Sequence, residues 1–350
     1  MVFTDSALRR WEYGLWPARA WIKRVIEQPS VRTFGAARYL DTLRHLSAPQ
    51  LLVLPGLEAA PFYYWRRSPF DRRGGQIRGW SQHLLVFGLD DPRAIQRLPL
   101  DAYDPYQGDR GAVPYQRFID AVTAQGGLVF WAHPETGHVG EHGPVEDYTD
   151  PYPHLLELTS GYHGFAITYR DKLAFVEAGG VWDRLLTAYC AGRRRQPVWM
   201  LGELDWRTPE AHPLDRVVTM VTVPERTAEA ILHALRTGRM WAVFRAGAQA
   251  PTLARFDVTD VASQQVAGIG ESIAPTGPLR IQVSGQRGSP EPGPARVFLI
   301  KDGAVVQMEE VTAEEFDLVW TDDAPPTRGF YRAVFQGPAG LIYTNPIFVR

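Results

Sequence analysis

The sequence predicts an α/β fold over residues 1–246, followed by a small all-β sandwich over residues 247–350. In the first part, short apolar runs alternate with segments of helical periodicity, which is the pattern of β/α units. In the second part, period-two strands are separated by turns. The strands of the first part are almost continuously apolar, which indicates a parallel sheet covered on both faces. Both a closed barrel and an open doubly wound sheet fit this pattern.

The individual elements follow from local patterns. In the segment 115–125, Phe118, Ile119 and Val122 form one apolar face of a helix, and two glycines end it. We expect strands at 2–4, 51–59, 83–89, 128–133, 155–160 and 197–205, and helices at 115–125, 181–192 and 227–237.

Composition narrows the class of protein. The 350 residues are 45% hydrophobic and 22% charged, as in ordinary globular proteins. A net charge of −2 gives no field that attracts nucleic acid, and no apolar run approaches the roughly 18 residues of a membrane span. No secretory leader precedes the first strand. We therefore expect a cytoplasmic protein, or a secreted one if the start codon lies upstream of Met1.

Polar side chains at the ends of strands are the candidates for chemistry, because reactive groups of parallel α/β folds gather at the carboxyl ends of strands. Glu58, His133 and Asp205 each lie at the end of an apolar strand. His83 differs, because it opens its strand. One glutamate and two histidines could form a three-ligand site for zinc, manganese or iron, with Asp205 as a fourth ligand.

Three segments resemble successive motifs of the PHP (polymerase and histidinol phosphatase) superfamily: "LLVLPGLEAA", "HLLVFGL" and "GGLVFWAHPE". The resemblance spans about residues 1–240. It implies a distorted (β/α)7-type barrel, here without its first strand, and a metal-dependent phosphoesterase or related hydrolase. It also implies that Glu58, His83 and His133 surround one metal position. The C-terminal part resembles the immunoglobulin-like β-sandwich that follows the barrel in some members.

Other ligands of the family are missing from this chain. The opening His-x-His pair is absent, and Ser6 stands where the next motif has histidine. In the last motif, Leu204 and Trp206 occupy the places of the aspartate and histidine, although Asp205 could replace the former after a shift of one residue. We therefore expect a reduced site that holds a single divalent ion or none.

Two functional hypotheses follow. In the first, the chain is a divergent PHP-type hydrolase of small anionic substrates such as phosphoesters, with Asp205 as ligand or base and Arg207 as a clamp for the anionic group. In the second, it is a non-catalytic relative in which Arg207 neutralises Glu58 and Asp205, and the pocket binds a ligand or serves as a scaffold.

Three further expectations concern the surroundings of the site. His138 and His142 lie in a glycine-rich segment, for which we expect a solvated loop. His163 follows a predicted strand and could face the same site. A barrel without its first strand exposes sheet edges, which another element of the chain or a second copy of the chain could cover.

Overall fold

The computed structural model describes residues 1–14, 18, 21–68, 72, 74–169, 174–206, 213–246, 249–288 and 293–350. The chain separates into two compact units, Met1–Tyr162 and His163–Arg350. The division at residues 246 and 247 that the sequence predicts stays a prediction. Strands prevail, with 41% of the described residues in strands and 18% in helices. None of the helices in the described residues is long and apolar enough to cross a membrane.

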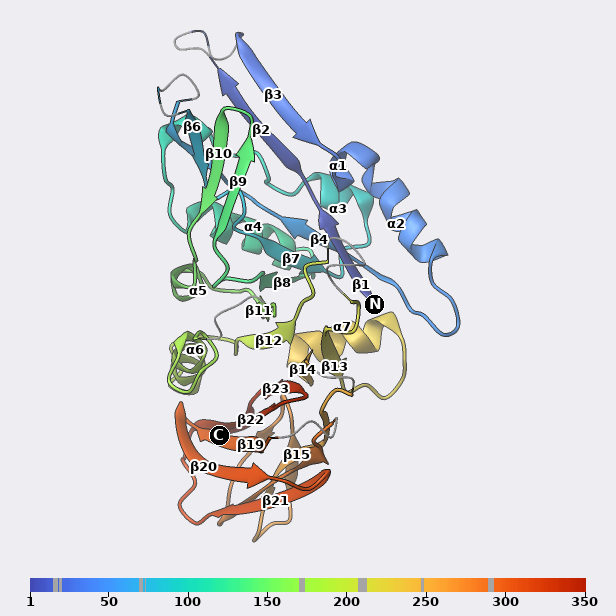
Figure 1. Ribbon diagram of the computed structural model, residues 1–350, viewed down its shortest axis with the longest axis vertical. Coiled ribbons are helices and arrows are strands. Elements are labelled where there is room, and N and C mark those ends of the chain that lie inside the picture. The colour runs from blue at the N-terminus through green and yellow to red at the C-terminus, as the bar shows by residue number, and fades with distance from the viewer. Residues whose placement is uncertain are drawn as a thin grey trace. The chain divides into compact units, whose positions relative to one another are not determined.

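The first unit is built around a sheet in which β1, β4, β7 and β8 are neighbours in that order (Figure 1). β1 runs parallel to β4, whereas β7 is antiparallel to both β4 and β8. Every residue of β7 and β8 is buried. The bounds are β1 Val2–Ser6, β4 Leu54–Ala59, β7 Leu84–Phe87 and β8 Leu128–Trp131.

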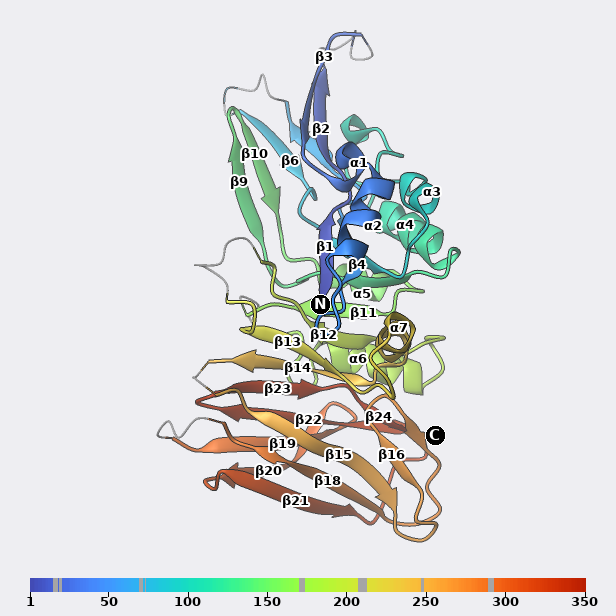
Figure 2. The same ribbon diagram turned by 90° about the vertical axis from the view of Figure 1, so that its right-hand side faces the viewer.

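Helices and a second sheet complete this unit. Figure 2 shows α2, α3 and α4 on one side of the unit and β6, β9 and β10 on the other. The helices are α1 Val31–Phe34, α2 Ala36–His45, α3 Pro92–Gln96, α4 Val113–Thr123 and α5 His154–Leu158, with a 3-10 turn at Pro105–Gln107. The second sheet is formed by β5 Tyr64–Arg67, β6 Gly75–Arg78, β10 Val145–Thr149 and β9 His138–His142, and a separate hairpin by β2 Arg9–Gly14 and β3 Lys23–Gln28.

The expected (β/α)7-type barrel is wrong, since the described part of the chain is mostly β, with several sheets and no closed barrel. The physical reason lies in the connections. Parallel neighbours require a crossover, usually a helix. The chain between β4 and β7 forms β5 and β6 instead, so β7 returns antiparallel to β4. The strand expected at 155–160 is also wrong, because residues His154–Leu158 form α5.

The second unit begins with a β/α/β segment and continues as a β-sandwich. Strands β11 and β12 are parallel, with α6 between them in sequence. The sequence predicts α6 and β12, but it places the preceding strand at 155–160 and misses β11. β13 and β14 precede residue 247, yet they share the larger sheet of the sandwich with later strands. The bounds are β11 Gly164–Ile167, α6 Val181–Cys190, β12 Trp199–Gly202, β13 Val217–Val221, α7 Ala228–Thr237 and β14 Met240–Arg245.

Two sheets form the sandwich. The larger has the order β13-β14-β23-β22-β19-β20, with β24 and β17 attached, and the smaller has the order β16-β15-β18-β21. Their buried faces share one apolar core, to which Val258 and Ile281 contribute from the smaller sheet and Val297 and Phe335 from the larger. The later strands are β15 Thr252–Asp260, β16 Val266–Gly268, β17 Ser272–Ile273, β18 Leu279–Gln286, β19 Ala295–Lys301, β20 Ala304–Val311, β21 Glu315–Asp322, β22 Gly329–Gly337, β23 Gly340–Thr344 and β24 Ile347–Val349.

Candidate metal centre

The antiparallel strands of the first unit bring three predicted side chains to one edge of the sheet. Glu58 lies at the end of β4, His83 directly before β7, and His133 two residues after β8. Because β7 is antiparallel to both neighbours, its beginning lies beside the ends of β4 and β8. The register confirms this, since Leu84 pairs with both Ala59 and Trp131. The same reversal that prevents a barrel therefore assembles this group.

The three side chains form a group that could hold a metal ion. One ligand atom from each of Glu58, His83 and His133 lies within 4.8 Å of the other two. His83 Nδ1 is 3.0 Å from Glu58 Oε1, and the two imidazole rings are nearly perpendicular, with centroids 5.5 Å apart. His133 is buried, whereas the side chains of Glu58 and His83 are 22% and 24% exposed. The group is thus partly open to solvent.

His83 lies close to Glu58 without forming a well-directed hydrogen bond. Its Nδ1 is buried and has no hydrogen bond of acceptable geometry, although Oε1 is only 3.0 Å away. A hydrogen bond requires the N–H to point along the line to the acceptor. Other buried polar atoms of the described residues, among them Trp131 Nε1 and Asp147 Oδ1, also have no such bond. The contact of His83 with Glu58 lowers the pKa of Glu58, and His133 lies beside this pair as a third potential ligand.

His133 has a strained backbone. Its φ of 27° lies in the left-handed region, where residues other than glycine are uncommon. The carbonyl of His133 accepts a hydrogen bond from the Thr136 N–H at 2.9 Å, so the turn after β8 helps to hold this conformation. Strain of this kind amounts to about 1–3 kcal/mol and is concentrated at functional sites.

Tyr152 connects the segments that carry the two histidines. Its fully buried hydroxyl donates to the Ala132 carbonyl at 2.5 Å and accepts from the His83 N–H at 3.3 Å. The N–H of Tyr152 in turn donates to the Pro134 carbonyl at 2.8 Å. Tyr152 therefore holds His83 and His133 in position. Sequence reasoning missed it, because a tyrosine 19 residues from the nearer histidine gives no signal by itself.

The charges around Glu58 favour its ionised form. Burial by itself raises the pKa of this carboxyl, but His83, with smaller contributions from His133 and Arg9, outweighs burial and lowers the pKa to about 2. Glu58 is thus a carboxylate over the whole physiological pH range. A permanently ionised carboxylate is the form that binds a metal ion.

A second polar cluster lies on the hairpin β9–β10. Asp147 is fully buried, accepts a hydrogen bond from Ser81 Oγ at 3.0 Å, and lies 3.4 Å from His138 Nε2. Burial raises its pKa, against the effect of Ser81, His142 and His83. The expectation of a solvated loop is wrong here, because His138–His142 form the strand β9.

The predicted roles of Asp205, His163 and Arg207 stay predictions. Asp205 follows β12 in the second unit, has a φ of 45°, and is not one of the three ligand-bearing side chains. His163 also belongs to the second unit. Arg207 lies outside the described residues, so its role as a clamp or as a neutralising cation stays a prediction.

Comparison with known proteins adds no relative. No protein-family model matches the chain, and none of the curated proteins matches it in sequence. The likeness of three segments to the PHP superfamily therefore stays a hypothesis.

Proposed function

We propose that this protein is a metal-dependent hydrolase that binds one divalent ion through Glu58, His83 and His133 and acts on small anionic substrates. The observation that carries the proposal is the convergence of three potential ligand atoms within 4.8 Å of one another.

The donor set fits a catalytic ion. Two histidines and one glutamate are the protein ligands of several hydrolytic zinc sites, in which a fourth position is left for water. Two ligands that each lie about 2.1 Å from an ion are separated by no more than about 4.2 Å. The observed bound of 4.8 Å is close to this value, so small rotations of the side chains suffice. Once bound, such an ion polarises a phosphoryl or carbonyl oxygen and lowers the pKa of a coordinated water.

Arg9 supports an anionic substrate. It begins β2, is exposed, and has no hydrogen-bond or ion-pair partner among the described residues. Its guanidinium carbon lies 5.5 Å from the centre of the Trp80 ring, and its charge acts on both Glu58 and Asp147. A cation that is close to the ligand group and forms no ion pair there can receive the negative group of a substrate. Arg9 thus takes the role that the sequence suggested for Arg207.

The experiment measures metal and activity together. Protein purified without added metal is analysed for zinc, manganese and iron, since the same ligand set also binds iron(II). Hydrolysis of p-nitrophenyl phosphate is then followed with Zn²⁺ or Mn²⁺. We expect about one ion per chain, and loss of both ion and activity in Glu58→Gln. The matched control Glu141→Gln changes an exposed glutamate on β9 and should lose neither.

The outcomes separate the two hypotheses. Arg9→Gln should keep the ion and raise KM with little effect on kcat, because it removes a substrate contact only. A chain that binds the ion but hydrolyses no phosphoester would support the ligand-binding hypothesis. A chain that neither contains nor takes up an ion would overturn the proposal.

A further inference from the structure

The larger sheet of the second unit ends in an exposed edge strand, β20. This strand is the last in the order of its sheet and pairs with β19. On its other side, its backbone groups form no hydrogen bond with a described residue. Seven of its eight residues are exposed, and only Val311 is buried. An edge of this kind is a template for pairing with a further strand.

The edge lacks most of the features that discourage such pairing. Natural edge strands are protected by lysine, proline, bulges or short length. β20 contains neither lysine nor proline, and its first five residues, 304–308, carry no charge. A register shift between Leu299 and Ile300 is the one irregularity of its ladder with β19. The edge is therefore open to an additional strand.

One face of β20 offers apolar side chains to such a strand. Val305 and Met308 are 49% and 50% exposed. Met308 lies opposite the half-buried Phe298 of β19. Val305 lies opposite the buried Ile300, so both side chains continue the apolar surface of β19. Directly opposite side chains of paired strands stabilise one another, so an added strand with apolar residues at these positions would cover this surface.

The charge of β20 determines the kind of strand that fits. Glu309 and Glu310 are exposed and, as neighbours in a strand, point to opposite faces of the sheet. Glu309 has no ion pair with a described residue, and Glu310 has one long contact, 3.9 Å, with Arg296. Basic residues opposite both glutamates would complement them.

We propose that β20 binds an extended segment of another protein by β-strand addition, with two adjacent basic residues of that segment opposite Glu309 and Glu310 and apolar residues beside Met308. Backbone hydrogen bonds supply affinity in this mode of recognition, and side chains supply specificity. A second copy of β20 fits less well, because this strand has no basic residue to place opposite the glutamates.

Fluorescence anisotropy of a labelled peptide with the full chain tests the proposal. The probe is Arg-Lys-Val-Thr-Val-Thr-Val, which in antiparallel pairing places its two cations opposite Glu310 and Glu309 and a valine opposite Met308. We expect this peptide to bind. A peptide that begins with Glu-Glu should bind at least tenfold more weakly, and the basic peptide with every backbone nitrogen methylated should not bind, because it cannot pair with an edge.

Variants of the chain locate the contact. The double variant Glu309→Lys, Glu310→Lys should reverse the preference, so that the Glu-Glu peptide binds more tightly than the basic one. Met308→Lys should weaken both peptides at least tenfold. The control Asp323→Lys changes an exposed carboxylate outside β20 and should leave the Kd of the basic peptide unchanged. Circular dichroism shows that each variant keeps its fold.

Four outcomes would overturn the proposal. Absence of binding would do so, and equal binding of the methylated peptide would show attraction by charge alone. An equal loss in Asp323→Lys would place the contact elsewhere. A dimer in sedimentation velocity that Met308→Lys converts to a monomer would show that a second copy occupies the edge.

Discussion

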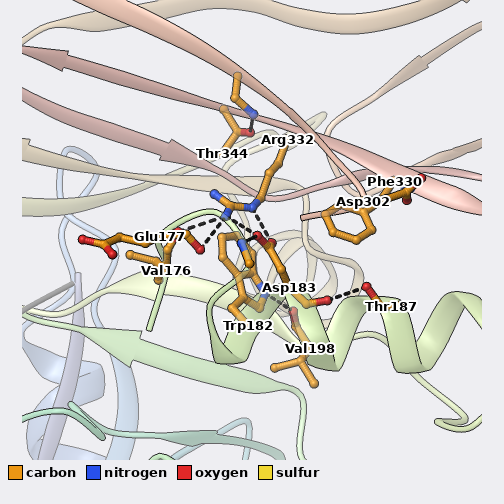
Figure 3. A network of polar contacts seen from close by, with 12 residues as sticks. Val176, Glu177, Trp182, Asp183, Thr187, Val198, Asp302, Phe330, Arg332 and Thr344 are labelled. Atoms are coloured by element: carbon orange, nitrogen blue, oxygen red, sulfur yellow. Dashed lines mark hydrogen bonds and ion pairs between the residues drawn. The ribbon is translucent and has the colours of Figure 1, made fainter. Parts of the chain in front are cut away.

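The two units of this protein each contain a cluster of charged or polar side chains, and the two clusters differ in their hydrogen bonds. In the second unit, Arg332 of β22 and Asp183 of α6 form a fully buried ion pair, with Nε and Nη2 each donating to a carboxylate oxygen at 2.7 Å (Figure 3). Nη2 also donates to the Val176 carbonyl at 3.0 Å, and the Trp182 ring lies 4.9 Å from the guanidinium carbon. Only Nη1 has no hydrogen bond within the described residues.

The candidate metal-binding group of the first unit differs from this ion pair. Its side chains approach one another at hydrogen-bond distance, but the buried His83 Nδ1 has no hydrogen bond of acceptable geometry, and His133 is strained. The buried pair has bidentate geometry and is part of the packing. The comparison teaches that burial and charge alone do not mark a site. The candidate group differs in that three potential ligand atoms converge at a position that is partly open to solvent.

The largest effect should come from breaking the buried ion pair. Asp183→Ala leaves the Arg332 guanidinium buried without its partner, and we expect a loss of about 3–5 kcal/mol in the free energy of unfolding. Urea denaturation measures it. Asp323→Ala removes an exposed carboxylate and should change stability by less than about 0.5 kcal/mol. Similar losses of the free energy of unfolding in both variants would contradict a stabilising role of the buried ion pair.

A metal ion bound by Glu58, His83 and His133 should stabilise the folded chain, and this stabilisation should not depend on the Asp183–Arg332 ion pair. At a free Zn²⁺ concentration of about 100 times the Kd, the free energy of unfolding should rise by about 2.7 kcal/mol relative to EDTA. Glu58→Gln should lose most of this gain, and Glu141→Gln should keep it. Thermal unfolding with Zn²⁺ and with EDTA provides the measurement. A full gain in Glu58→Gln would place the ion elsewhere.

Tyr152→Phe should affect stability and metal affinity together. The variant removes a hydroxyl that bonds the His83 N–H and the Ala132 carbonyl, which should cost about 1–2 kcal/mol and weaken metal binding about tenfold. The control is Tyr162→Phe, whose buried hydroxyl donates to the Leu156 carbonyl at 2.6 Å. It should lose similar stability with unchanged metal affinity. Equal metal affinity in both variants would contradict the positioning role of Tyr152.

The smallest effect should be the pH dependence of stability that arises from the hydrogen-bonded carboxylate of Asp260. The backbone N–H of Thr276, with further donors, outweighs burial and holds the pKa of Asp260 below its usual range. A lowered folded-state pKa adds stability that is present above the unfolded value of about 3.9 and is lost as pH falls below it. Asp260→Asn should therefore be less stable at pH 5 and lose less on acidification to pH 3. Urea unfolding at both pH values tests this prediction. An equal loss of the free energy of unfolding between pH 5 and pH 3 in the variant and in the unchanged chain would refute it.

The sequence indicated the three residues of the candidate metal centre and less of the fold. Glu58, His83 and His133 were recognisable because each adjoins a short apolar strand. The direction of those strands was not recognisable, because a fully buried strand has the same apolar run whichever way its neighbour runs. His83, at the start of its strand, was the one hint of a reversal. Tyr152 could not be predicted, because its role depends only on where its hydroxyl lies.

The sequence by itself determined which segments are buried, the period-two strands of the sandwich, and which residues could bind a metal, since these depend on local pattern and side-chain chemistry. Only the tertiary structure decided that β7 runs antiparallel to β4 and β8, and that Glu58, His83 and His133 therefore meet at one edge. The reason is physical. Strand pairing and cavities arise from contacts between segments far apart in the chain, which no local pattern encodes.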